Sequence, residues 1–212
     1  MPLFYYSKKQ KIRGWKRQKR KIERWKQAAI DLDIDYIREY QRTNTKLSIP
    51  PFYRLIRRNP PSWYNTLLLE AMLEVYMEWH QKMKKENEDF YLKIWLYHPH
   101  FIESQIVVAY KDYLHAYDDT FIKRTNSKPF PYHIFQSLQN QLKQFEWELC
   151  MNTLYYDESE FTEWIMDGQI SEKEVQAIKQ KAYDVSSIHL ENDTQYLIDK
   201  GDVWVGTLSY QD

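Results

Sequence analysis

Residues 62–85 read SWYNTLLLEAMLEVYMEWHQKMKK and form the strongest helical pattern in the chain. Apolar side chains recur every three or four positions along one side of this pattern, at Leu68, Met72, Val75, Trp79 and Met83. Such a repeat is typical of a helix with one buried face, and Ser62 is a suitable N-cap residue after two prolines. We therefore predict one long amphipathic helix, from Ser62 to about Lys85, that packs against a sheet.

The sheet that this helix covers is expected to begin directly after it. Apolar residues alternate with polar or aromatic ones over residues 91–97, and the alternation resumes over residues 102–108, which indicates a hairpin. Residues 145–152 alternate in the same way and predict a half-exposed strand. Residues 196–198 and 203–205 flank a short polar stretch and predict a second hairpin. Short connections between paired strands favour an α+β fold with a mainly antiparallel sheet.

Polar capping residues mark shorter helices elsewhere. The candidate N-caps are Asp31, Asp33 or Asp35 for a helix that ends near Tyr40, Ser159 for a helix stopped by Gly168, and Ser171 for a third helix. The signal at Ser171 is the most specific, because Glu174 follows three residues later and completes a capping box.

The N-terminal end of the chain carries a strong positive charge. Residues 8–26 contain eleven basic residues and one acidic residue, a net charge of +10, and the remainder carries −10 because the whole chain is formally neutral. Residues 8–30 also follow a helical pattern, with a narrow apolar stripe of Ile12, Trp15, Ile22, Trp25 and Ala29. We predict a basic helical arm over residues 1–30, attached to a single α+β domain over residues 31–212.

The residues expected to bind a partner lie on this arm. They are Arg13, Trp15, Lys16, Arg17, Arg20, Arg24 and Trp25. Clustered cations attract a polyanion and indole rings stack on unpaired bases, so RNA or DNA is one candidate partner. The alternative is an acidic surface of this chain, of a second copy or of another protein, since the chain from residue 144 onward has fifteen acidic and four basic residues. The apolar stripe explains both tryptophans without a ligand, which favours this alternative.

Composition argues against several enzyme classes. The four glycines are scattered, so the chain contains no P-loop, dinucleotide-binding fingerprint or G-x-S-x-G elbow. The single cysteine, Cys150, allows neither an intrachain disulfide nor a Cys-x-x-Cys zinc pair, and we predict no cofactor. The sequence has no secretory signal and no apolar run of about eighteen residues. We therefore expect a cytoplasmic protein with no membrane partner.

Three histidines are the candidates for metal chemistry. His98 and His100 bracket Pro99, and His115 lies among aspartates, so their imidazole nitrogens could converge on a divalent ion. The spacing is not diagnostic of a metal site. A metal-dependent hydrolase is therefore the third-ranked hypothesis.

Two stretches of the chain resemble a known protein family. RRNPPSWYN followed by LLLEAMLEVYMEW, and then YLKIWLYHPHFIESQIVVAY, are similar to an uncharacterised family of small proteins from Gram-positive bacteria, a domain of unknown function. The resemblance spans roughly residues 10–160 and implies a bacterial setting, without an activity or a catalytic residue. We expect a non-enzymatic protein-interaction module, by analogy with toxin-neutralising or phage-related inhibitor proteins. The alternative is an RNA- or DNA-binding protein that uses the basic helix.

Overall fold

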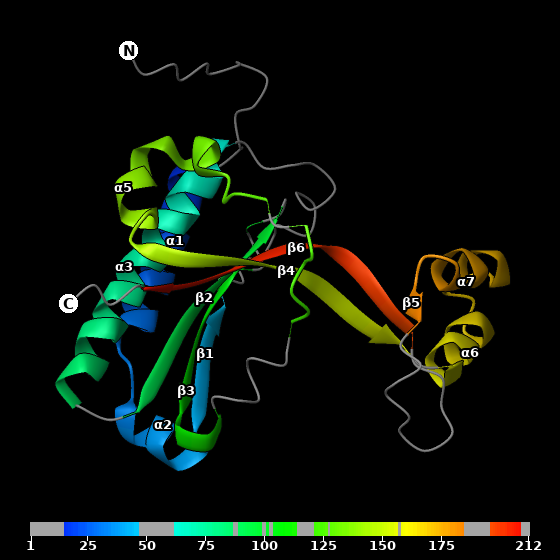
Figure 1. Ribbon diagram of the computed structural model, residues 1–212, viewed down its shortest axis with the longest axis horizontal. Coiled ribbons are helices and arrows are strands. Elements are labelled where there is room, and N and C mark those ends of the chain that lie inside the picture. The colour runs from blue at the N-terminus through cyan, green and yellow to red at the C-terminus, as the bar shows by residue number, and fades with distance from the viewer. Residues whose placement is uncertain are drawn as a thin grey trace.

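The computed structural model combines one layer of helices with one antiparallel sheet, from which two strands extend (Figure 1). The structure describes residues 15–46, 62–86, 89–98, 101, 104–113, 121–126, 128–156, 158–184 and 196–208. The helices are α1 (Trp15–Ile30), α2 (Ile34–Tyr40), α3 (Ser62–Glu86), η4 (Lys111–Tyr113), η5 (Tyr132–Leu138), α5 (Gln139–Leu142), α6 (Glu158–Met166) and α7 (Glu172–Lys179). The strands are β1 (Arg42–Lys46), β2 (Phe90–His98), β3 (Gln105–Tyr110), β4 (Phe145–Tyr156), β5 (Tyr183–Asp184) and β6 (Tyr196–Leu208).

The sheet has the strand order β1-β3-β2-β6-β4, and β5 pairs with β6 outside this path. All of these pairs are antiparallel. The predicted hairpin of residues 91–108 is present as β2 and β3, with Ile94 opposite Ile106. β6, the last strand in the chain, lies between β2 and β4. The α+β fold with an antiparallel sheet is therefore confirmed.

The long helix α3 covers one face of this sheet, as the sequence predicts. Its apolar stripe, including Met72, Val75 and Trp79, is buried in one cluster with strand residues such as Ile94 and Trp204. A smaller buried cluster lies on the opposite face of the sheet and comprises Trp95, Val107, Cys150, Val203 and Val205. The burial of each large apolar side chain contributes about 1.5–3 kcal/mol to stability. The two clusters therefore stabilise the sheet from both sides.

A tryptophan on β4 requires a glycine on its neighbour β6. Trp147 lies opposite Gly206, and a Cβ atom placed on Gly206 would be 2.4 Å from the Trp147 ring. The indole stacks on Phe130, with ring centroids 4.2 Å apart, and its Nε1–H donates to the carbonyl oxygen of Leu142 at 2.9 Å. These contacts hold the ring over the strand, so only glycine fits at position 206.

β4 and β6 continue beyond the rest of the sheet as a two-stranded ribbon (Figure 1). Their pairing extends to Tyr156 opposite Tyr196. The register shifts between Asn152 and Thr153, and nearby Gly201 has a φ of 139°. Glycine adopts this backbone conformation without a steric penalty, so the irregularity is a β-bulge of the kind that bends a strand.

Arg124 contacts residues on both sides of the bulge in β6. Arg124 Nη2 lies 2.6 Å from an oxygen of Asp199 and 2.9 Å from the carbonyl oxygen of Gly201, and its Nε lies 2.9 Å from an oxygen of Asp202. The three charged side chains are only 20–22% exposed. Because partial burial strengthens charge interactions, Arg124 fixes the point at which the ribbon leaves the sheet.

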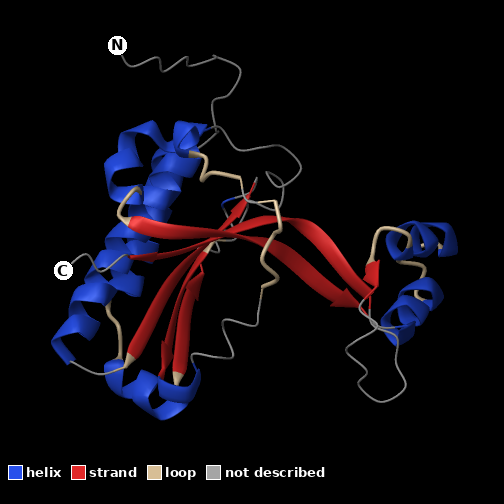
Figure 2. Cartoon of the chain, viewed as in Figure 1, coloured by secondary structure: helices blue, strands red, loops and turns tan. Residues whose placement is uncertain are grey.

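A small lobe sits at the tip of the ribbon, at the far end of the molecule from α1 and α3 (Figure 2). We call residues 158–184, which comprise α6, α7 and β5, the distal lobe. Phe161 and Val175 are buried in the lobe. Lys179 Nζ lies 2.6 Å from both carboxylate oxygens of Glu158, which also accepts a hydrogen bond from Tyr196. The hydrogen bond from Lys179 is the main reason that the pKa of Glu158 lies below its ordinary value.

Several local predictions are confirmed and one is wrong. Asp33 caps α2 by accepting from the backbone N–H of Tyr36, and Ser171 and Glu174 form the predicted capping box. Residues 196–205 do not form a hairpin, because β6 runs straight through them and Gly201 lies at its bulge. The arm helix begins at Trp15 within the described chain, and the predicted turns before it lie outside the described residues.

Candidate functional site

Helix α1 is docked on α3 by its apolar side. Ile22 is 3% exposed and belongs to the main core, and the half-buried Trp25 packs against the same cluster. Trp79 of α3 donates its indole N–H to the carbonyl oxygen of Ala29 at 2.7 Å. Apolar contact and a specific hydrogen bond thus fix the orientation of α1 on the body.

The opposite side of α1 is an exposed cationic surface. We define the basic face as Lys16, Arg17, Lys19, Arg20 and Arg24, all of which are exposed. At 3.6 residues per turn, four of these side chains fall within an arc of about 100° that lies roughly opposite the buried Ile22. Among the described residues, the structure records no ion pair for any member of the basic face. A shallow hollow of about 560 Å³ runs along this side of the helix, and the described residues that line it include Arg17, Arg20 and Arg24.

Lys26 is the α1 cation that pairs with the body. Its Nζ lies 2.6 Å from Glu74 of α3 and 3.1 Å from Glu23 of its own helix. The hydrogen bond to Glu74 is the main cause of the raised pKa of Lys26, and the hydrogen bond from Lys26 is the main cause of the lowered pKa of Glu23. Lys26 therefore helps to dock the helix on α3.

The structure separates the predicted site residues into two groups. Lys16, Arg17, Arg20 and Arg24 share the exposed side of α1. Trp25 is half-buried and packs against the core. Arg13 lies outside the described residues, as does the side chain of Trp15.

The acidic part of the chain does not cover the basic face within the described residues. The distal lobe carries many of the acidic residues after position 144, and Figure 1 shows it at the other end of the molecule from α1. The ion pair between Glu158 and Lys179 is internal to the lobe. Within the described residues, α1 therefore does not dock through its charge on the acidic part of the chain after residue 144, as the sequence led us to expect. It docks mainly through apolar contacts on α3.

The predicted metal ligands are not assembled in the described part of the chain. His98 lies at the end of β2, where its ring contacts Phe101 edge-on with centroids 5.8 Å apart. His100 and His115 lie outside the described residues. Within the described ranges, no three histidine, cysteine, aspartate or glutamate side chains are grouped as a metal site would require.

A groove that no sequence pattern predicts lies on the sheet face opposite α3. This groove has a volume of about 440 Å³, with Trp95, Phe121 and Cys150 among its apolar lining and Lys123 and Glu148 among its charged lining. Lys123 Nζ lies 2.8 Å from a carboxylate oxygen of Glu148, so these two charges offset each other. Residues of β2, β4, β6 and the segment 121–123 line the groove. No local sequence pattern indicates that these segments lie together.

Cys150 in this groove is not an activated nucleophile. The side chain is 3% exposed, and burial, followed by the negative charge of Glu148, raises the pKa of its thiol to about 11. Nucleophilic cysteines react as thiolates and have lowered pKa values. Cys150 therefore stays protonated at neutral pH and acts as part of the apolar packing.

Comparison with protein-family models, curated proteins and solved structures found no match. The resemblance to a domain of unknown function therefore stays a prediction. The helices of the described ranges are all too short or too polar to cross a lipid bilayer.

Proposed function

We propose that the protein binds nucleic acid through the basic face of α1. The observation that carries this proposal is the exposure of Lys16, Arg17, Lys19, Arg20 and Arg24 without a recorded ion pair to any described carboxylate. Like charges one turn apart on a helix destabilise it, and a polyanion removes that repulsion. The apolar side of α1 is already occupied by α3, so the helix presents its charge outward in a fixed orientation.

Dimensions support a phosphate backbone as the ligand. The basic face runs from Lys16 to Arg24 and spans about 12 Å at about 1.5 Å per residue. A duplex carries one phosphate charge per about 1.7 Å of its axis, so about seven phosphates of its two strands lie within this length. The five cations can therefore each meet a different phosphate of a duplex. Because Trp25 is packed on the core, the contacts are to the backbone and are expected to show little sequence preference.

The salt dependence of binding tests this proposal. We expect the logarithm of the affinity for duplex DNA to fall against the logarithm of salt concentration with a slope of about −4.5, from about −0.9 for each of five phosphate contacts. Replacement of Arg17, Arg20 and Arg24 by glutamine should reduce that slope by about 2.7. Fluorescence anisotropy with labelled duplex and single-stranded oligonucleotides measures both values.

A matched control separates this face from charge in general. Lys84, Lys85 and Lys143 are exposed and lie outside α1, so their replacement by glutamine removes the same charge. We expect the slope of this control to differ from the wild-type slope by less than about 0.9, the contribution of one phosphate contact. Absence of binding by the intact protein at low salt, or an equal loss in both variants, would overturn the proposal.

A second candidate function is a protein-interaction module, which the distal lobe favours. The lobe has seven acidic and three basic residues, and Glu163 and Asp167, which are close in sequence to the 81% exposed Met166, are themselves exposed. A single exposed apolar side chain is ordinary on a protein surface, so the negative charge of the lobe is the feature that favours a basic partner.

A further inference from the structure

The molecule is neutral as a whole but has opposite charges at its two ends. Helix α1 has seven basic residues and one acidic residue, a net charge of +6. The distal lobe has seven acidic and three basic residues, a net charge of −4. Figure 1 shows the two at opposite ends of the longest axis. Because the chain is neutral as a whole, two copies repel each other little, and the positive end of one copy can attract the negative end of another.

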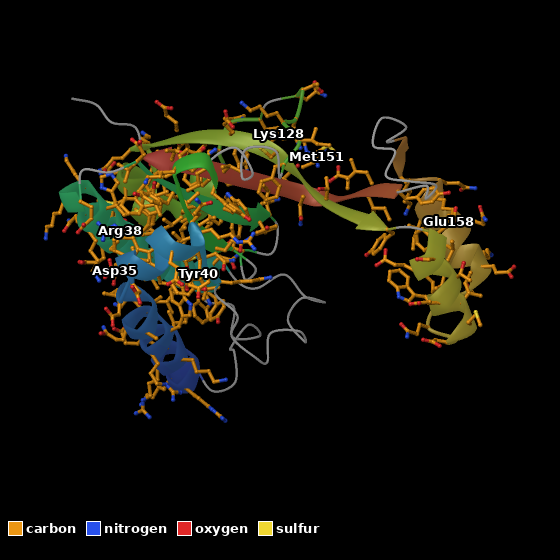
Figure 3. All side chains as sticks on the ribbon, turned by 90° about the horizontal axis from the view of Figure 1, so that it is seen from below. Asp35, Arg38, Tyr40, Lys128, Met151 and Glu158 are labelled. Carbon is orange, nitrogen blue, oxygen red and sulfur yellow. The ribbon has the colours of Figure 1, made fainter. Side chains whose placement is uncertain are left out.

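We propose that two copies associate side by side and antiparallel, with the distal lobe of each against the basic face of the other. Both elements lie on the same side of the ribbon: Figure 3 shows α1 and α6, near the label of Glu158, below it. Two copies related by a twofold axis therefore make the same contact twice, and the pair is closed. This arrangement matches the charge of each face with its opposite.

The surfaces that meet are unpaired within the described residues of one chain. The basic face has no recorded ion pair there, as described above. On the lobe, Glu163, Asp167 and Glu172 are exposed, and the described residues provide no ion pair for them either. The exposed side chain of Met166 adds apolar area to the same lobe. The second copy thus satisfies groups that one chain leaves in solvent.

The mass of the wild-type protein in solution is the first test. Light scattering coupled to gel filtration should give the mass of two chains at low ionic strength. In about 1 M salt, where the screening length falls to about 3 Å, the mass should fall to that of one chain. A wild-type protein that stays a monomer at low salt and high concentration would overturn the proposal.

Charge reversal identifies the surfaces. The arm variant carries Arg17→Glu, Arg20→Glu and Arg24→Glu, and the lobe variant carries Glu163→Lys, Asp167→Lys and Glu172→Lys. Each variant alone should be a monomer. The arm variant lowers the net charge of α1 from +6 to 0, so α1 no longer attracts the lobe, and the lobe variant changes the lobe from −4 to +2, so the lobe repels α1. An equimolar mixture should form a heterodimer, because one of its contacts is unaltered and the other joins the three introduced carboxylates to the three introduced ammonium groups. Circular dichroism and cooperative melting establish that each variant is folded.

A third variant controls for net charge. Lys84→Glu, Lys85→Glu and Lys143→Glu change the total charge as much as the arm variant does, at exposed positions outside the proposed contact. This control should stay a dimer and should not form a stable heterodimer with the lobe variant, because one of the two contacts in that pair would join two positive surfaces. Loss of the control dimer, or failure of the arm and lobe variants to combine, would show that the contact is not the one proposed.

The association does not depend on nucleic-acid binding, and the lobe variant distinguishes the two. Its α1 is unchanged, so it should bind oligonucleotide at least as tightly as the wild type while being monomeric. If both proposals hold, oligonucleotide competes with the lobe for the basic face and splits the wild-type dimer. A dimer that binds no oligonucleotide overturns only the proposed function, and a monomer that binds it overturns only the association.

Discussion

Replacement of Gly206 by alanine is expected to destabilise the protein by about 2–4 kcal/mol. The new Cβ atom would lie 2.4–2.8 Å from three ring carbons of Trp147, whereas ordinary contacts begin at 3.4 Å. The ring would have to move by about 1 Å, which would disturb its stack on Phe130 and its hydrogen bond to the carbonyl oxygen of Leu142. Overpacking of this kind costs about 1–3 kcal/mol, and the lost hydrogen bond costs about 1 kcal/mol more.

A double-mutant cycle tests the physical cause. In a Trp147→Leu background the obstructing ring is absent, so Gly206→Ala should cost less than about 0.5 kcal/mol, with a coupling energy of at least about 2 kcal/mol. Urea denaturation followed by circular dichroism gives the four free energies, because this signal does not depend on the indole that is removed. An equal cost of Gly206→Ala in both backgrounds would refute the steric reasoning.

A second glycine provides the control. Gly168 follows α6 with a φ of 67°, and a Cβ atom there would have nothing within 4 Å. Gly168→Ala should therefore cost about 1–2 kcal/mol from backbone strain alone. Because no ring is involved, we expect that cost to be the same with and without Trp147.

Three further predictions concern other parts of the molecule. Arg124→Met should lower the free energy of unfolding, measured in urea, by about 2 kcal/mol, a value between those of exposed and buried ion pairs. The reason is that Asp199, which is only 20% exposed, loses its partner. A loss within experimental error would contradict the role of this arginine. Cys150 should react with iodoacetamide at pH 8 only at the rate of unfolding, as mass spectrometry will show, and fast labelling of the native protein would disprove its burial. The lowered pKa of Glu158 means that its contribution to stability is complete above pH 4.5 and is lost as the pH falls through the folded value, so hydrogen exchange in the distal lobe should accelerate in acid. A Lys179→Met variant should show a weaker pH dependence, because the hydrogen bond from Tyr196, which also lowers this pKa, remains.

Elements with strong local periodicity were predictable from the sequence. The stripe of α3 repeats over about four turns, from Leu68 to Met83, and β2 and β3 alternate on either side of a proline. The capping box at Ser171 depends only on two residues three positions apart, and the structure contains it as predicted. In each case the information that specifies the element lies within the element itself.

Elements that depend on distant partners were not predictable in this way. β1 has the polar sequence RTNTK and is a strand because it pairs with β3 along one edge of the sheet. Arg124 meets Asp199 across 75 positions in the sequence. The hairpin predicted around Gly201 was wrong because a glycine in the polar stretch 199–202 suits a bulge as well as a turn. Only pairing with β4 distinguishes the two outcomes.

The candidate site was predictable in composition and less so in geometry. Counting charges identified the cations of α1, and helical spacing identified the stripe that holds Trp25. The spacing did not show that α3 would be the surface on which α1 docks. Nor did it show that the acidic lobe would be carried away from α1 by the ribbon, because that distance arises from the length of β4 and β6 beyond their neighbours.

The pairing of Tyr156 with Tyr196 has a consequence for how this chain can change over time. The polypeptide leaves the ribbon and returns to it at two points directly across from each other. The segment between these two points can therefore be replaced by a different module, or shortened to a tight turn, while β4 and β6 keep their register. The scaffold can therefore acquire new recognition surfaces at this end without redesign of its core.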